Sequence, residues 1–179
     1  DLVIANIEEA KRPRLALQIA RLQSAQGHYD KAADTLQKFK DSAGPLHPEI
    51  LAELGFARCK QHRESPSCLD YRAGLSFLEE ANNLLKNPSQ NVPTNTRKHN
   101  SLLARALACK AWALEAVRGQ ASEARACYQQ ALQLEPRNPY YLTDVIGHEI
   151  NWGGGRLDIV GAMRASLLAS IATCREHMK

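Results

Sequence analysis

The chain has 179 residues, which is long enough for one domain with a buried core. Hydrophobic residues make up 44% of it and charged residues 23%, but aromatic residues only 6%, so alanine and leucine must supply much of the packing. This composition favours closely packed helices over a sandwich of strands. The net charge of +4 is only a weak indication of acidic partners.

Two classes of partner find little support in the sequence. The compact basic runs, Lys11–Arg12 with Arg14 and Arg97–Lys98, come without a nucleic-acid recognition motif, so we expect no nucleic-acid partner. No apolar run approaches the roughly 20 residues that cross a bilayer, and no signal peptide is visible, so we expect no membrane partner. The chain begins at Asp1 without a methionine, and we expect it to be part of a longer protein.

The five cysteines are odd in number and widely scattered. Three of them, Cys109, Cys127 and Cys174, stand in helix-like sequence, where a cysteine usually serves as a small buried hydrophobe. This usage favours a reducing cytoplasm over a disulfide framework.

In chain order, the predicted helices come in pairs. Apolar residues at helical spacing, interrupted by glycine, proline and polar turns, define each of them. The pairs are 15–25 with 30–39, 48–60 with 69–85, 100–117 with 122–134, and 140–150 with a long helix from Leu157 onward. The polar, proline-bearing stretch KNPSQNVPTNT separates the second pair from the third. Alternating runs and hairpin signals are missing, so no strands are expected.

Three pairs share one spacing of small and large residues. The steps run from a glycine to a small residue five positions on, then four to a large residue and three to the next apolar one. The positions are Gly27, Ala32, Leu36 and Phe39; Gly74, Leu78 and Ala81 (the last two steps only); and Gly119, Ala124, Tyr128 and Ala131. Small residues let a neighbouring helix approach closely, so we predict that Ala32, Ala124 and Ala131 are buried.

This pattern resembles the tetratricopeptide repeat, a helix-turn-helix unit with a period of about 34 residues. The residues that carry the resemblance are Ala20, Gly27, Tyr29, Ala32, Leu36 and Pro45; Leu54, Gly55, Tyr71, Gly74, Leu78 and Ala81; and Gly119, Ala124, Tyr128, Ala131, Leu132 and Pro136. The likeness covers about 15–139. It departs from the family in its long insertions and at Trp112, which stands where the family usually has a small residue. A generic helical bundle with coincidental alanine spacing is the alternative.

The resemblance implies an all-α, right-handed α-solenoid of about four helix-turn-helix units. These units would be approximately 13–45, 47–88, 97–136 and 138–179, in a single domain over 1–179.

No combination of residues predicts an active site. Cys59, His62 and Cys68 could hold zinc, but they lack a paired Cys-x-x-Cys knuckle. His148–Glu149 begins like a zinc-protease helix, yet Trp152 stands where the second histidine is required. The glycines at 153–155 have neither a preceding strand nor a following Lys-Ser/Thr, which excludes a phosphate loop. We therefore expect no enzyme, no metal and no cofactor.

The resemblance implies that the first helices of the units line a concave groove that holds a peptide or helix of another protein. Mapping the family's groove positions onto this chain predicts partner-binding residues in three units. They are Arg14, Leu17 and Arg21; Phe56 and Lys60, with Glu49 and Ala52; and Cys109 and Ala113, with Ala106 and Val117. One end of this groove would be basic and the other small and apolar.

Two functions follow as hypotheses. The first is a protein–protein interaction module for a partner segment, possibly an acidic one. The alternative is an internal scaffold or sensor domain of a larger effector whose catalytic part lies elsewhere. A further hypothesis concerns the last predicted helix, which carries an apolar stripe of Val160, Met163, Leu167, Ile171, Cys174 and Met178. The end of this stripe, Ile171, Cys174 and Met178, predicts a contact with a following helix or a homodimer, and fraying of this end is the alternative.

Overall fold

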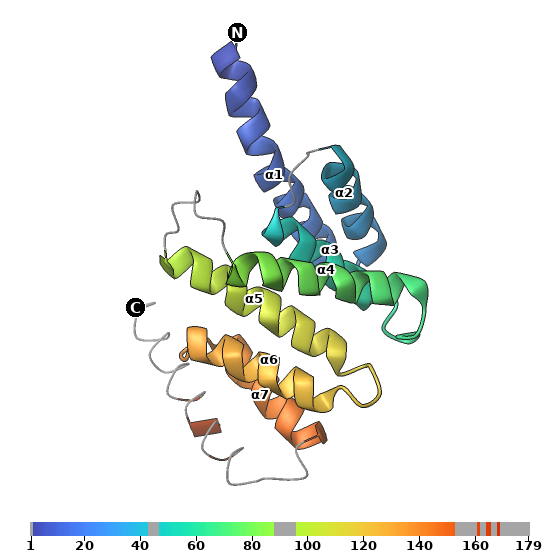
Figure 1. Cartoon of the computed structure of the whole chain (residues 1–179), viewed down its shortest axis with the longest axis vertical. Coiled ribbons are helices and arrows are strands. Elements are labelled where there is room, and N and C mark those ends of the chain that lie inside the picture. The colour runs from blue at the N-terminus through green and yellow to red at the C-terminus, as the bar shows by residue number, and fades with distance from the viewer. Residues whose placement is uncertain are drawn as a thin grey trace. The chain divides into compact units, whose positions relative to one another are not determined.

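The part of the chain that a computed structural model describes consists of helices joined by turns, with no strand among the described residues (Figure 1). It comprises residues 2–42, 47–87 and 96–152, with Gly161, Arg164, Ala165 and Leu168 beyond them, and it describes side chains from Pro13 onward. The seven helices in it are α1 (Leu2–Ala25), α2 (Tyr29–Ser42), α3 (Pro48–Gln61), α4 (Leu69–Lys86), α5 (Thr96–Leu114), α6 (Ala121–Leu134) and α7 (Pro139–Trp152). The all-α prediction is confirmed.

The chain divides into two compact units. Unit 1 is Asp1–Ser89 and contains α1 to α4, while unit 2 is Gln90–Lys179 and contains α5 to α7. The boundary falls in the polar, proline-bearing stretch that separates the second predicted pair from the third. The grouping of all four predicted repeats in one domain stays a prediction.

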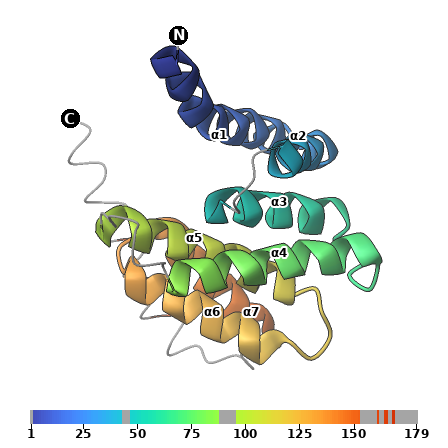
Figure 2. The same ribbon diagram turned by 45° about the horizontal axis from the view of Figure 1, so that its top comes forward.

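Within unit 1, each helix packs against its neighbour in the chain, and α1 also contacts α3. Helix α3 therefore lies between the α1–α2 pair and α4, as Figure 2 shows. Within unit 2, α5 packs on α6, α6 on α7, and α5 also touches α7. The contacts of α1 with α3 and of α5 with α7 place the first helices of successive pairs side by side. This is the packing that the repeat pattern predicts.

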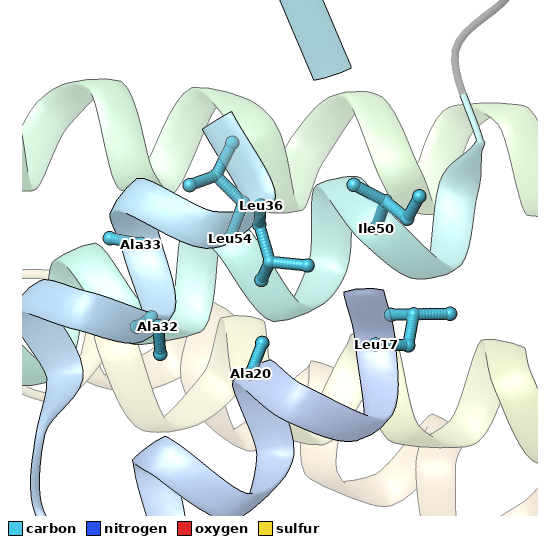
Figure 3. Close-up of a cluster of buried hydrophobic side chains, with 8 residues drawn as sticks. Leu17, Ala20, Ala32, Ala33, Leu36, Ile50 and Leu54 are labelled. Atoms are coloured by element: carbon cyan, nitrogen blue, oxygen red, sulfur yellow. The ribbon is translucent and has the colours of Figure 1, made fainter. Parts of the chain in front are cut away.

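The core of unit 1 is built from small and branched aliphatic side chains of three helices (Figure 3). Its buried members are Leu17 and Ala20 from α1, Ala32, Ala33 and Leu36 from α2, and Ile50, Leu54 and Ala57 from α3. Phe39 and Phe77 pack against its edge. Because alanines occupy half of these positions, the helices can approach closely without large side chains between them.

The predicted burial of the small residues is confirmed in both units. Ala32, Ala124 and Ala131 are all 0% exposed, and Tyr128 between the last two is 2% exposed.

The turns before α2 and α6 have the same backbone conformation at their glycines. Gly27 and Gly119 both adopt a positive φ, of 80° and 84°, in a region that other L-residues rarely enter. The first and third predicted pairs therefore share a turn geometry as well as a spacing.

Helices α3 and α4 cross at two glycines. A Cβ atom added to Gly55 would lie 2.6 Å from the Gly74 carbonyl oxygen, and one added to Gly74 would lie 2.9 Å from the Gly55 carbonyl oxygen. Both contacts are with backbone, which cannot move aside as a flexible side chain could. The small residues that carried the repeat resemblance in the second pair are thus required by the close approach of the two helices.

The structure differs from the sequence predictions at several helix ends. Helix α1 begins at Leu2 instead of Leu15 and continues through Pro13. A proline removes one backbone hydrogen bond but does not prevent helix on either side. Helix α5 ends at Leu114, so Val117 lies in the turn beyond it. Helix α7 runs on through Trp152, whose side chain is exposed.

The predicted closing helix from Leu157 lies outside the described residues except for Gly161, Arg164, Ala165 and Leu168, which are helical. The apolar stripe and the homodimer that it suggested therefore stay predictions. None of the helices within the described ranges is both long and apolar enough to cross a membrane.

Candidate partner-binding surfaces

One face of α3 carries a continuous stripe of polar and aromatic side chains. Glu49, Glu53, Phe56 and Lys60 follow one another at spacings of four, three and four residues, which places them on the same side of a helix. The Phe56 ring is partly exposed, and the Lys60 ammonium lies 5.3 Å from its centre. This distance is within the range of a cation–π interaction.

Helix α1 contributes Arg21 to the same surface. Its Nε donates a hydrogen bond to Glu53 Oε1 at 2.8 Å, and its Nη2 donates one to Glu49 Oε1 at 2.8 Å. Glu53 is only 7% exposed, and this guanidinium helps to compensate the charge of its buried carboxylate. Two turns before Arg21 on α1, Arg14 is exposed. We call Arg14, Arg21, Glu49, Glu53, Phe56 and Lys60 the first-helix face.

The structure corrects part of the predicted groove in unit 1. Arg14, Phe56 and Lys60 lie at the surface or partly so, as a binding residue must. Leu17, in contrast, is 4% exposed and belongs to the core, so it cannot present its side chain to a partner. The Arg21 guanidinium lies at the surface and forms ion pairs with both Glu49 and Glu53, so this end of the predicted groove is an ion-pair cluster instead of a simple basic patch.

Three of the remaining predicted residues, Ala106, Cys109 and Ala113, lie on α5, in unit 2. Cys109 is half-buried, whereas Ala113 is 0% exposed and fills the interior of the unit. Ala106, which the mapping also placed in the groove, is 0% exposed as well, and Ala52 on α3 is 6% exposed. The alanines that the mapping placed along the groove, Ala52, Ala106 and Ala113, are therefore buried inside their units.

A second surface lies at one end of unit 2, where sequence reasoning predicted nothing. A hollow of about 880 Å³ is lined by the first turns of α5, the turn between α6 and α7, and the start of α7. Arg97 comes from the first of these segments, Arg137 from the second and Tyr140 from the third. We call this hollow the α5–α7 hollow. The sequence signal that could have found it was the Arg97–Lys98 run, which was used only to exclude a nucleic-acid partner.

Unit 2 also contains two polar side-chain contacts to α7 that sequence analysis missed. Arg125 on α6 binds both carboxylate oxygens of Glu149 on α7, each at 2.6 Å, and Glu149 is 1% exposed. His148 Nδ1 lies 2.9 Å from Glu115 Oε1, and the His148 ring is tilted against Tyr128 at 5.6 Å between centres. His148–Glu149 thus holds α7 in place, which explains the dipeptide without any metal chemistry.

The cysteines near α4 have structural contacts. The Cys68 sulfur accepts a hydrogen bond from the Tyr71 backbone N–H at 3.4 Å and so caps the start of α4. The Cys59 thiol is buried and donates to the Tyr71 carbonyl oxygen at 3.7 Å. Across the described ranges, no three histidine, cysteine or acidic side chains come together as metal ligands would.

Comparison with known proteins gives little beyond this geometry. No protein-family model matches the chain, and no curated protein matches it. Among solved structures, the chain is similar to residues 41 to the end of MamA from Desulfovibrio magneticus RS-1, at 15% identity and a TM-score of 0.35. That alignment covers 92% of this chain and 96% of the other. Identity and structural similarity at this level assign neither a family nor a function.

Proposed function

We propose that this chain is a protein–protein interaction module that binds a peptide or helical segment of a partner on its first-helix face. The observation that carries the proposal is the Phe56 ring, which remains partly exposed in a stripe whose two carboxylates are already paired with Arg21. A rigid aromatic ring on a helix provides a large contact area at little entropic cost, which is typical of residues that dominate binding energy.

The charges of this face indicate which partner segment it fits. Arg14, Arg21 and Lys60 are set against Glu49 and Glu53, which leaves an excess of one positive charge. The face therefore suits a segment with an apolar side chain that contacts Phe56 and at most a mildly acidic flank. This is a less basic surface than the sequence mapping predicted, because Glu53 was not part of that mapping.

The test is a selection of peptides from a displayed random library on the intact chain. We expect one family of related peptides to be enriched, and Phe56→Ala to weaken the binding of its members by about 2 kcal/mol, as truncation of an anchor residue does. The matched control is Leu69→Ala, since Leu69 is an exposed apolar residue on α4 and lies outside the face. Equal binding to the parent and to Phe56→Ala would contradict the proposal.

A further inference from the structure

We propose that the α5–α7 hollow is a second docking surface, which takes an acidic segment of another protein that carries an aromatic or aliphatic side chain. The hollow lies on unit 2, and none of its lining residues belongs to the first-helix face. Its volume of about 880 Å³ is ample for several side chains of a bound segment.

The charge of the hollow favours an anionic occupant. Within the described part of the chain, Arg97 and Arg137 are exposed and form no ion pair. The one carboxylate of the lining, Glu135, already accepts a hydrogen bond from Asn138 Nδ2 at 2.7 Å. Both helices that open here, α5 and α7, lack an acidic residue in the first turn, so their positive N-terminal ends add to the field of the two arginines.

The apolar part of the hollow favours a protein segment over a small anion. Tyr140 is 76% exposed, although its aromatic neighbour Tyr141 is buried. Leu134, Pro136 and Pro139 line the same hollow and supply apolar surface beside that ring. A free phosphate would use only the arginines, whereas an acidic segment with one aromatic or aliphatic side chain would use both kinds of surface.

Hydrogen bonds at the Tyr140 backbone and the Asn138 side chain fix the shape of the hollow. The Tyr140 N–H donates a hydrogen bond to Asn138 Oδ1 at 3.0 Å, and the Asn138 amide in turn holds Glu135. The turn between α6 and α7 is thus tied to the start of α7 on either side of Arg137. A segment that binds here meets a preformed surface, which lowers the entropy that binding must overcome.

The experiment measures fluorescence anisotropy of a short labelled peptide of glutamates and aspartates around one tryptophan, titrated with the intact chain. Arg137→Glu should weaken binding by about tenfold, because it replaces an attractive charge by a repulsive one. The matched control is Arg118→Glu, which makes the same charge change in the exposed turn between α5 and α6 and should bind like the parent. Tyr140→Ala should also weaken binding, and Ile150→Ala, an exposed apolar position further along α7, should not.

Three results would overturn this inference. They are failure of the parent to bind the acidic peptide, an equal loss of affinity for Arg137→Glu and Arg118→Glu, and full retention of affinity when the tryptophan is replaced by serine. Phe56→Ala shows which of the two surfaces, the first-helix face or the α5–α7 hollow, binds the acidic peptide. If it abolishes binding of the acidic peptide while Arg137→Glu does not, the first-helix face is the site for this peptide and the hollow is not.

Discussion

Gly55 is the residue whose replacement tests the close helix crossing of unit 1 most simply. An alanine there would place its Cβ 2.6 Å from the Gly74 carbonyl oxygen and 2.8 Å from Leu78 Cγ. We therefore expect Gly55→Ala to lower the free energy of unfolding by about 1–3 kcal/mol, as overpacking of a core does.

The chain offers a matched control for that substitution. Gly147 lies within α7, and a Cβ added to it would have no neighbour within 4 Å. Gly147→Ala should stabilise the protein by up to about 1 kcal/mol, because alanine is the better helix former. Urea denaturation followed by circular dichroism measures both variants. Equal stability of Gly55→Ala and the parent would show that α3 and α4 do not cross at this distance.

Tyr141 gives a prediction for alkaline pH. Burial of its phenol, assisted by the negative charge of Glu135, raises the pKa of Tyr141 to about 12. In the unfolded chain the phenol ionises near pH 10. The stabilising contribution of this group is therefore complete below about pH 10 and is lost as the pH rises toward 12, because only the unfolded state releases the proton in that window.

Unfolding measured across this range should show that Tyr141→Phe loses less stability than the parent. The neighbouring Tyr140, which is 76% exposed, supplies the control, since Tyr140→Phe should follow the parent. Identical alkaline profiles for Tyr141→Phe and the parent would mean that the phenol is not buried as described.

At the scale of the helices, α7 depends on the bidentate contact between Arg125 and Glu149. Glu149 is 1% exposed, whereas the Arg125 side chain is 32% exposed. Arg125→Met would leave a buried carboxylate without its cation, and loss of one partner of a buried pair costs about 3–5 kcal/mol. Because water reaches the arginine, we expect the lower end of that range.

The double variant Arg125→Met with Glu149→Leu provides the decisive comparison. It removes the buried charge together with its partner, so it should be more stable than Arg125→Met alone. Thermal unfolding of the four proteins completes a double-mutant cycle. Additive losses from the two single changes would show that the two side chains do not interact.

Helix positions and spacing could be predicted because they repeat locally along the chain. The 69–85 prediction ends one residue before α4 does, and Gly27 and Gly119, which lie between the predicted helices of their pairs, form turns in the structure. The predicted start of the first helix at Leu15 was wrong, because α1 begins at Leu2 and continues through Pro13. Periodicity thus identified the helices better than it identified their ends.

The surface residues were harder to predict because their partners lie far away in the sequence. Arg21 meets Glu49 and Glu53 across 28 and 32 residues, and no periodicity indicates which charges meet. One signal was present: Glu49 and Glu53 are like charges four residues apart on a helix, an arrangement that is unfavourable unless a cation lies between them. Leu17 and Ala113 were misassigned because the family mapping identifies helix faces but not burial.

For the whole molecule, we propose that the first helices of unit 1, α1 and α3, form the binding surface and that the second helices, α2 and α4, support them. The alternative function, a scaffold domain within a larger effector, is compatible with the same helices and differs in what flanks them. For both functions, we expect a bound partner segment to contact mainly α1 and α3, and to contact α2 and α4 little or not at all.

The measurement that tests this claim most directly is amide chemical-shift mapping by NMR with a peptide selected on the intact chain. We predict that the perturbed amides cluster around Arg14, Phe56 and Lys60, and that Phe56→Ala strongly reduces the perturbations at the same peptide concentration while Leu69→Ala preserves them. Perturbations confined to α2 and α4, with none on α1 or α3, would contradict it.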